Sequence, residues 1–336
     1  MADSVKRRAW AIFDRIVSDA APNGEFTSPW REGVYEPDWE VLQKLLGAAL
    51  YLKAKTTTQV PALALDVWTA YELRRAGFAP DAVWPRAEHP RVMPRPIAAL
   101  IPQVYRDDKA GLLKKLAQQA PMTNVVATDA RILGKHYMKQ VDVVMSSWET
   151  GPELLISTKR MDSSFGKNAA NRVEESYGDA KNLRSRHPLA ALGFLYALRS
   201  TILTTEPDKA LWLIDLLTKL GQEDDAYDAV GLIMLDYEVD GPEDSDGGLA
   251  DEDALEGAGI ADLHTADAED DAPDVALSEV DDALRNLPVV HLRHDVVPDR
   301  LQAGRFLAEM VLHVLAATPV NFHADARYRY LNGGGS

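Results

Sequence analysis

The sequence contains no cysteine among its 336 residues, which excludes disulfide bonds, zinc–thiolate sites and a cysteine nucleophile. It has no run that approaches the roughly 20 apolar residues needed to span a bilayer, and no apolar core of a signal peptide follows the N-terminus. We therefore expect a cytoplasmic protein that does not interact with a membrane. With 46% hydrophobic residues, the chain can form one large domain or two smaller ones.

Lysine and arginine are absent from one long stretch. Between Glu223 and Asp282 the sequence has 23 acidic residues and no basic residue. The formal net charge of the whole chain is -16, but outside this stretch 36 basic residues face 29 acidic ones, a net charge of +7. A strongly acidic protein is a poor partner for nucleic acid. A mildly basic body with one acidic stretch is not excluded from the class of nucleic-acid-binding proteins.

The densest part of the acidic stretch, about residues 239–282, lies between two predicted strands and is therefore interpreted as an insertion in a folded domain. Three interpretations stay open. The insertion is disordered and solubilising, as expected for a segment of high like charge. Alternatively, it mimics DNA and folds over a basic site in autoinhibition, or it binds a basic protein partner.

The chain divides into two regions. Residues 1–108 predict a helical N-terminal region, with helices over 5–20, 38–53 and 60–75. A segment rich in proline and arginine at 80–96 is interpreted as a connector in preference to an arm that reaches a DNA groove. Residues 109–330 form the second region, and the final Gly-Gly-Gly-Ser at 333–336 resembles an engineered linker.

In the second region, short apolar runs are separated by turn residues and predict a small antiparallel sheet. Its strands are expected over 125–126, 139–146 and 153–160. Helical periodicity occurs before these strands at 109–118 and after them at 167–183, 188–203, 208–220 and 299–316. Two later strands are expected over 229–238 and 287–293.

Asp142 and Lys159 each lie within a largely apolar predicted strand. Successive side chains of a strand point to opposite faces, so Asp142 lies on one face of 139–146, and Ser157 and Lys159 share a face of 153–160. Burying a charge without a partner or a metal is costly. Neighbouring strands that each bring one charge into an apolar setting therefore indicate a site. The alternative is a structural salt bridge between Asp142 and Lys159.

This pattern, an acid followed by a hairpin and then Ser157-Thr158-Lys159, resembles the PD-(D/E)XK nuclease superfamily. Ser157 stands where that superfamily usually has Asp or Glu. In a subgroup of restriction endonucleases that cut sites with a CCGG core, serine replaces this acid and a glutamate on the following helix supplies the carboxylate. The resemblance assigns that role to Glu174 or Glu175, with Glu153 as a further candidate acid.

Helical geometry favours Glu174 over Glu175 at this stage. Ala170, Val173, Tyr177 and Ala180 are expected to form the inward stripe of the helix, and Glu174 flanks it.

The resemblance implies an α/β fold, with a restriction-endonuclease-like mixed sheet flanked by helices, and a DNA endonuclease of restriction or phage-defence type. Asp142 and Glu174 would hold Mg²⁺, and Lys159 would orient the attacking water and stabilise the transition state. The partners would be double-stranded DNA and a second copy of the chain, since cutting two strands suits a two-fold dimer. Six cations near the site are candidates for phosphate contacts: Arg160, Lys167, Arg172, Lys181, Arg184 and Arg186.

Other interpretations belong to different functional classes. Ser157 can mark the loss of the metal site in a catalytically inactive nuclease-fold module that binds a protein partner through the acidic insertion. The chain can also be a nuclease subunit that acts only within a larger defence complex. For Glu174, the alternative is an exposed charge paired with Lys167 or Arg172, and for the six cations it is an ordinary solvated helix face.

Overall fold

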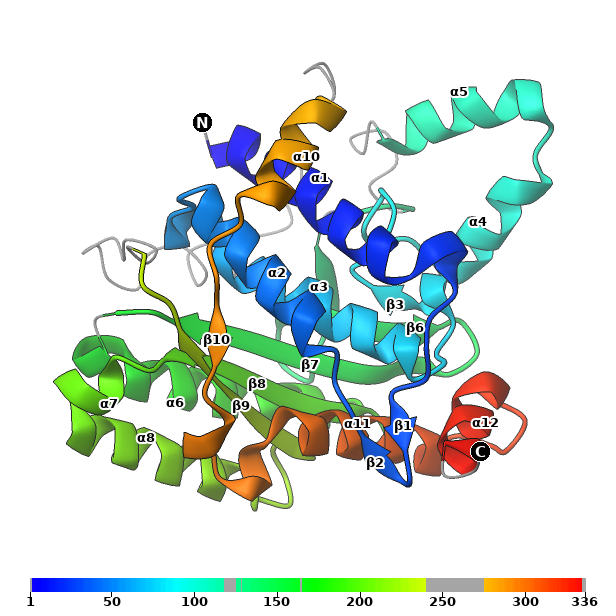
Figure 1. Ribbon diagram of the computed structural model, residues 1–336. Coiled ribbons are helices and arrows are strands. Elements are labelled where there is room, and N and C mark those ends of the chain that lie inside the picture. Colours follow the sequence, from blue (N-terminus) through cyan, green and yellow to red (C-terminus); the bar gives the residue numbers. More distant parts are fainter. Residues whose placement is uncertain (1, 118–124, 128, 164, 240–274, 334–336) are drawn as a thin grey trace.

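The computed structural model describes residues 2–117, 125–127, 129–163, 165–239 and 275–333, and shows an α/β protein built on a curled mixed sheet (Figure 1). Six described strands follow the order β10-β9-β8-β7-β6-β3. Strands β7, β8 and β9 are parallel, whereas β3, β6 and β10 pair antiparallel to their neighbours. Their bounds are β3 Val83–Trp84, β6 Val143–Ser147, β7 Gly151–Met161, β8 Ala191–Arg199, β9 Ala229–Asp236 and β10 His291–Leu292.

Two small hairpins stand beside this sheet. Strands β1 (Trp30–Arg31) and β2 (Val34–Tyr35) form one of them. Strands β4 (Ala130–Leu133) and β5 (Met138–Val141) form the other, which leads directly into β6.

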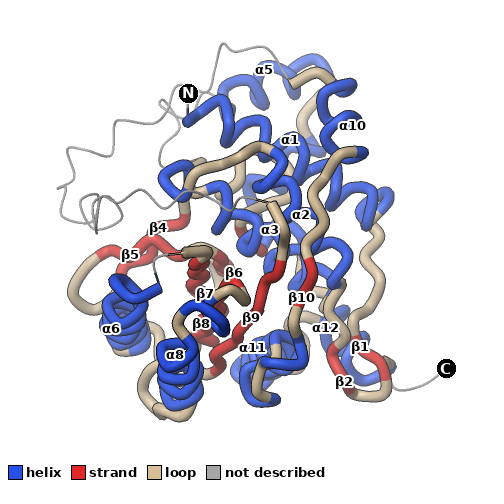
Figure 2. Tube along the Cα trace, turned by 60° about the vertical axis from the view of Figure 1, so that its left-hand side comes forward, coloured by secondary structure: helices blue, strands red, loops and turns tan. Residues whose placement is uncertain are grey.

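Helices cover both faces of the sheet, as Figure 2 shows. On one face lie α6 (Phe165–Arg184) and α8 (Pro207–Leu220), with the short α7 (Ile202–Thr205) before α8. The helices of the opposite face include α1 (Ala2–Ala20), α2 (Trp39–Tyr51), α3 (Val60–Arg75), α10 (Leu277–Arg285), α11 (Ala303–Ala317) and α12 (Ala324–Asn332). Helices α4 (Arg95–Leu100) and α5 (Arg106–Ala117) extend from the β3 side. None of the helices in the described ranges has the length and apolarity required to cross a membrane.

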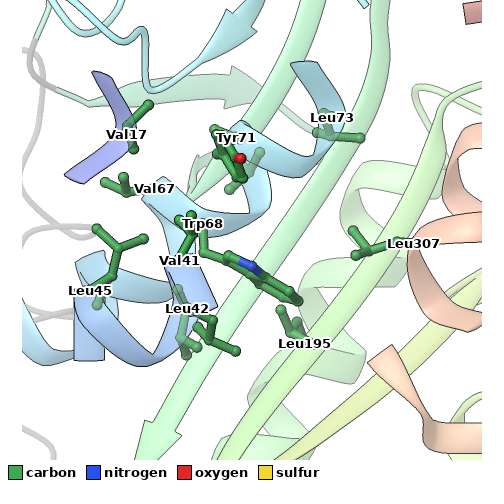
Figure 3. Close-up of a cluster of buried hydrophobic side chains, with 14 of the residues drawn as sticks. Val17, Val41, Leu42, Leu45, Val67, Trp68, Tyr71, Leu73, Leu195 and Leu307 are labelled. Carbon is green, nitrogen blue, oxygen red and sulfur yellow. The ribbon is translucent and has the colours of Figure 1, made fainter. Parts of the chain in front are cut away.

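Helix α3 is central to the layer opposite α6. It is buried nearly all round because it packs on the sheet with one side and on α1 and α2 with the other. The indole of Trp68 is fully buried and lies near Leu42 of α2 and Leu195 of β8 (Figure 3). The predicted helical N-terminal region is thus confirmed, and it shares one hydrophobic cluster with the sheet.

Two glycines let α11 approach the parallel strands. A Cβ atom at Gly193 of β8 would lie 2.9 Å from both Phe306 and Met310, and one at Gly231 of β9 would lie 3.0 Å from Phe306. The phenyl ring of Phe306 therefore fits against the strands only because Gly193 and Gly231 have no side chain. Close contact between α11 and the strands fixes the sheet on this side.

The helix predicted over 188–203 is wrong, because this segment contains the central strand β8. Each of its residues up to Leu198 is buried, since helices cover both faces and parallel strands lie on both sides. A strand buried on both faces reads as a continuous apolar run, and such a run fits the helical period as well as the strand period. Because β8 is a strand and pairs parallel with β7 and β9, the sheet is larger than the expected antiparallel sheet and is mixed.

The proline- and arginine-rich segment at 80–96 is a connector that packs against the helical layer. Arg86 is buried and donates to Asp81 at 2.7 Å, and Arg91 is buried and donates to Asp14 of α1 at 2.7 Å. The Arg91 guanidinium also lies 3.9 Å from the ring centroid of Trp10. These two cations hold the connector against the helical layer and are not presented to a groove.

Most of the acidic insertion, residues 240–274, lies outside the described residues. Its last part is helix α10, which packs beside α1. Glu279 binds Arg8, and Asp281 binds Arg15 at 3.2 Å. Glu279 and Asp281 of the insertion therefore pair with cations of the N-terminal helix, on the layer opposite α6. The autoinhibition hypothesis stays a prediction for residues 240–274.

Candidate active site

Asp142 lies at the junction between two sheets. Strand β5 ends at Val141 and β6 begins at Val143, so the predicted single strand over 139–146 is broken at the acid. Val143 pairs with Ile156 at the end of the β6–β7 ladder. Beyond this pair, the Thr158 amide donates to Asp142 Oδ2 at 2.7 Å, so the half-buried carboxylate takes the place of a ladder carbonyl. The break therefore fixes the carboxylate against β7.

The two faces of β7 have different surroundings. Leu155 and Met161 belong to the apolar cluster beneath α6, whereas Ile156 belongs to the cluster beneath α3. By strand alternation, Ser157 and Lys159 face α6. The structure thus brings Asp142, Ser157 and Lys159 together at one end of the β6–β7 pair.

Thr158 points to the opposite face. Its Oγ1 donates to Asp66 of α3, a carboxylate buried beneath the sheet. Helix α3 of the N-terminal region thus binds the side chain of Thr158, and the amide of Thr158 binds Asp142. Sequence reasoning missed Asp66 because 92 residues separate it from Thr158, and the only available signal is an acid inside an apolar helix.

Tyr227 is a second residue that sequence reasoning missed. It precedes β9 inside the acidic stretch, and its ring stacks on Phe194 of β8 with 5.3 Å between centroids. The hydroxyl donates to the Ser176 carbonyl of α6 at 2.7 Å and also lies beside Ser157. Burial, together with the negative charges of Asp179 and Asp142, raises the pKa of Tyr227 well above its ordinary value. The phenol therefore stays protonated beneath the site.

The two candidate glutamates of α6 lie on different faces. Glu175 precedes Asp179 by one turn and Asn182 by two turns, and both of these residues bind the β4–β5 hairpin. Glu174 instead shares a face with Lys181, which binds Asp225 on the side toward β9. Since β5 ends next to Asp142, Glu175 is on the side of α6 nearer that acid. Both side chains are exposed.

The stripe predicted for α6 differs slightly from the observed one. Val173, Ser176, Ala180 and Leu183 are buried, whereas Tyr177 is only half-buried. This stripe places Glu174 and Glu175 at similar depths, so flanking the stripe does not distinguish them. The two glutamates are distinguished by the contacts of the helical turns that follow them, with the β4–β5 hairpin for Glu175 and with Asp225 for Glu174.

Arg160 does not suit the predicted phosphate contact. Its side chain faces α3, is buried, and donates to Asp162 at 2.8 and 2.9 Å and to the Pro61 carbonyl at 3.2 Å. Tyr237 also donates to Asp162. Strand alternation explains this placement, because Arg160 follows Lys159 and must point the other way. Arg160 therefore belongs to a structural network.

The other predicted DNA-binding cations differ in accessibility. Arg184 donates to the Ala190 carbonyl at 2.9 Å and binds Asp228, so it is engaged within the fold. Lys181 binds Asp225, and Arg186 is exposed at the end of α6. The side chains of Lys167 and Arg172 lie outside the part that the structure describes.

Glu153 is far along β7 from the junction. It lies near the start of the strand, where it is buried and accepts a hydrogen bond from Thr150. Its Oε2 lies 2.9 Å from His323 Nε2. Asp142 and Glu153 are thus at opposite ends of the β6–β7 pair, and the structure does not bring Glu153 to the candidate site.

The donor set near Asp142 fits a hard cation. Mg²⁺ prefers oxygen ligands and is commonly held by one or two carboxylates while it keeps several waters. Asp142 and Ser157 would supply a carboxylate and a hydroxyl from neighbouring strands, and Glu175 would supply a second carboxylate from α6. Within the described ranges, no three acidic or histidine side chains are already gathered as a metal cluster.

Comparison of the chain with protein families, curated proteins and solved structures gave no match. Its function is therefore argued from the site itself.

Proposed function

We propose that the protein is a Mg²⁺-dependent DNA endonuclease of restriction or phage-defence type, with a restriction-endonuclease-like sheet, that acts as a homodimer. The observation that carries this proposal is the junction at Asp142. There the carboxylate is held by the amide of Thr158, the residue between Ser157 and Lys159. An acid, a hydroxyl and an ammonium group thus converge at the end of two paired strands.

Each residue has a role that its position supports. The Thr158 amide orients the Asp142 carboxylate toward the α6 side, where Asp142 and Glu175 would hold Mg²⁺. When bound, Mg²⁺ would supply a water of lowered pKa and offset charge on the scissile phosphate. The ammonium group of Lys159, on the same face, would orient the water and bind the phosphate oxygen on which charge develops. Tyr227 would hold α6 at a fixed distance from β7 through the Ser176 carbonyl.

The test uses the purified full chain with plasmid and linear duplex DNA, modified and unmodified, in Mg²⁺ or in EDTA. We expect cleavage in Mg²⁺, and a loss of at least about 10²-fold in Lys159→Ala and in Asp142→Asn. Asparagine keeps an oxygen that accepts from the Thr158 amide, so the second variant should keep the fold. Cleavage by Lys159→Ala at the wild-type rate would refute the assignment.

Glu174 and Glu175 form a matched pair within the same experiment. Both are exposed residues of one helix, and they occupy different faces of it. Glu175→Gln is expected to weaken cleavage and to raise the Mg²⁺ concentration needed for half-maximal activity, whereas Glu174→Gln should retain wild-type behaviour. The reverse result would return the ligand role to Glu174, the residue first expected from the sequence.

One observation favours a second function, a catalytically inactive nuclease-fold module that binds a protein partner. Ser157 replaces the expected acid and lies beside the Tyr227 hydroxyl, so its own hydroxyl has a structural partner. A titration with Mn²⁺ or Ca²⁺ separates the two functions. A metal that binds the native state raises the unfolding temperature, whereas an inactive module would show no change.

A further inference from the structure

The β4–β5 hairpin connects directly to the candidate active site, because Asp142 is the next residue after β5. Its pairs are Ala130 with Val141, Arg131 with Gln140, Ile132 with Lys139, and Leu133 with Met138. Ala130, Val141 and Ile132 join the apolar cluster beneath α6. The other face of the hairpin consists of Arg131, Leu133, Met138 and Gln140.

The turn of the hairpin is fixed to α6 by one side chain. Asn182 Oδ1 accepts from the amides of His136 at 2.8 Å and Tyr137 at 3.4 Å, and Asn182 Nδ2 donates to the Tyr137 carbonyl at 3.2 Å. A Cβ atom at Gly134 would lie 2.1 Å from this amide group, so only glycine fits. The turn is therefore held in one position on the helix.

Further contacts hold the inner face and the edges. The Tyr137 hydroxyl donates to Asp179 at 2.9 Å, and Lys139 binds Asp179 at 2.9 Å. The ring of His187 donates to the Leu133 carbonyl at 2.9 Å. These contacts leave the outer face in solvent, with Leu133 44% and Met138 46% exposed.

The outer face is cationic as well as apolar. Arg131 and Lys135 are exposed, and neither side chain forms an ion pair with another residue in the described ranges. Arg186 is exposed beside His187, and therefore extends the same basic surface to the end of α6. Asp129, at the base of the hairpin, is half-buried, and Asp179 binds Tyr137 and Lys139.

We propose that the outer face of the β4–β5 hairpin enters the major groove of double-stranded DNA and positions the duplex over Asp142. This inference rests on the proposed function. The major groove admits a two-stranded β-ribbon, and a ribbon anchored at its turn needs no ordering when it binds. Arg131 and Lys135 would bind phosphates on the groove walls.

The remaining outer side chains suit base edges. Gln140 carries an amide of the kind that pairs with adenine, and Leu133 and Met138 offer apolar contact to a thymine methyl group. Gln140 precedes Asp142 by two residues. Bases read by the hairpin would thus lie close to the phosphate that is cut, so sequence choice and cleavage would depend on one rigid segment.

The test measures binding of a duplex of about 30 base pairs in Mg²⁺ over a range of salt concentrations, in a Lys159→Ala background that prevents cleavage. Arg131→Glu with Lys135→Glu should weaken binding by about tenfold or more and reduce the slope of log K against log salt by about 2. Lys53→Glu, an exposed charge reversal on the opposite layer, should leave both unchanged. Thermal unfolding confirms that each variant is folded.

The outcomes separate the inference from the function on which it rests. If the wild type cleaves DNA but the hairpin variant binds with unchanged affinity, the hairpin inference is wrong and the nuclease proposal stands. If the wild type neither cleaves nor binds any duplex in Mg²⁺, the nuclease proposal fails. Equal binding of duplex RNA, whose major groove is too narrow for a ribbon, would overturn the groove assignment.

Discussion

Thr158 connects the two faces of strand β7 at a single position. Its amide holds Asp142 on the side of α6, and its hydroxyl binds Asp66 on the side of α3. Hydrogen bonds that involve a charged group and a buried residue are stronger than exposed ones. The orientation of the candidate metal ligand therefore depends on a helix that contributes no ligand.

Arg160 gives a prediction that separates a structural role from DNA binding. Arg160→Ala would leave the carboxylate of Asp162 buried without its cation, and we expect a loss of about 3–5 kcal/mol in the free energy of unfolding. Urea denaturation measures this loss. Arg186→Ala, at an exposed position just after α6, should change stability by less than about 0.5 kcal/mol. Wild-type stability in Arg160→Ala would contradict the structural network.

The convergence of Asp142, Ser157 and Lys159 could be anticipated from the sequence, because strand alternation and a short hairpin are local rules. The same rule places Arg160 on the opposite face. Asp66 and Tyr227 could not be anticipated, since each reaches the site through the packing of distant segments. The choice between Glu174 and Glu175 also depended on a distant contact, that of the next turn of α6 with the β4–β5 hairpin.

At the scale of elements, the helices were easier to predict than the sheet. The range of α8 follows from its apolar periodicity and from Gly221, which ends it. Strand β8 was mistaken for a helix because burial on both faces removes the alternation that identifies a strand. The break between β5 and β6 gave no signal, since it depends on where the β4–β5 hairpin leaves the main sheet.

Asn182 provides a prediction for the hairpin as an element. Asn182→Ala removes the partners of three backbone groups of the turn, and we expect a loss of about 1–3 kcal/mol in unfolding free energy. Amide hydrogen exchange should accelerate over residues 134–139, while β7 and β8 stay protected. Asn286→Ala, at the exposed asparagine that follows α10, is the matched control. Unchanged exchange over the turn would show that other contacts suffice to anchor it.

At the scale of the whole molecule, charges are paired on one layer and exposed at one surface of the other. Glu279 and Asp281 of α10 bind Arg8 and Arg15 of α1, whereas the exposed cations of the β4–β5 hairpin lie on the side of α6. The net charge of -16 is therefore a poor guide to the potential at any one surface.

The pair of Glu153 and His323 joins the C-terminal segment to β7 and predicts a pH dependence of stability. Burial raises the pKa of Glu153, but the contacts with His323 and Thr150 outweigh it, so the pKa lies below its ordinary value. A lowered folded-state pKa contributes stability above the unfolded value of about 4.3, and this contribution is lost as the pH falls through the folded-state pKa. Glu153→Gln should thus be less stable than the wild type in urea at pH 7.

As the pH is lowered from 7 through the folded-state pKa, the difference between Glu153→Gln and the wild type should shrink, because the wild-type carboxyl then becomes protonated. A difference that stays constant over the whole pH range would show that the substitution acts through packing and not through charge.

The apolar cluster that extends from α1 to α12 also determines which fragments of this chain can fold by themselves. A fragment that begins at residue 109 would expose to water the faces of β6 and β7 that α3 covers. Strand β7 would also lose Asp66, the partner of Thr158. Transplanting the candidate active site into another protein therefore requires α3 to move with it, although the two segments lie about a hundred positions apart along the chain.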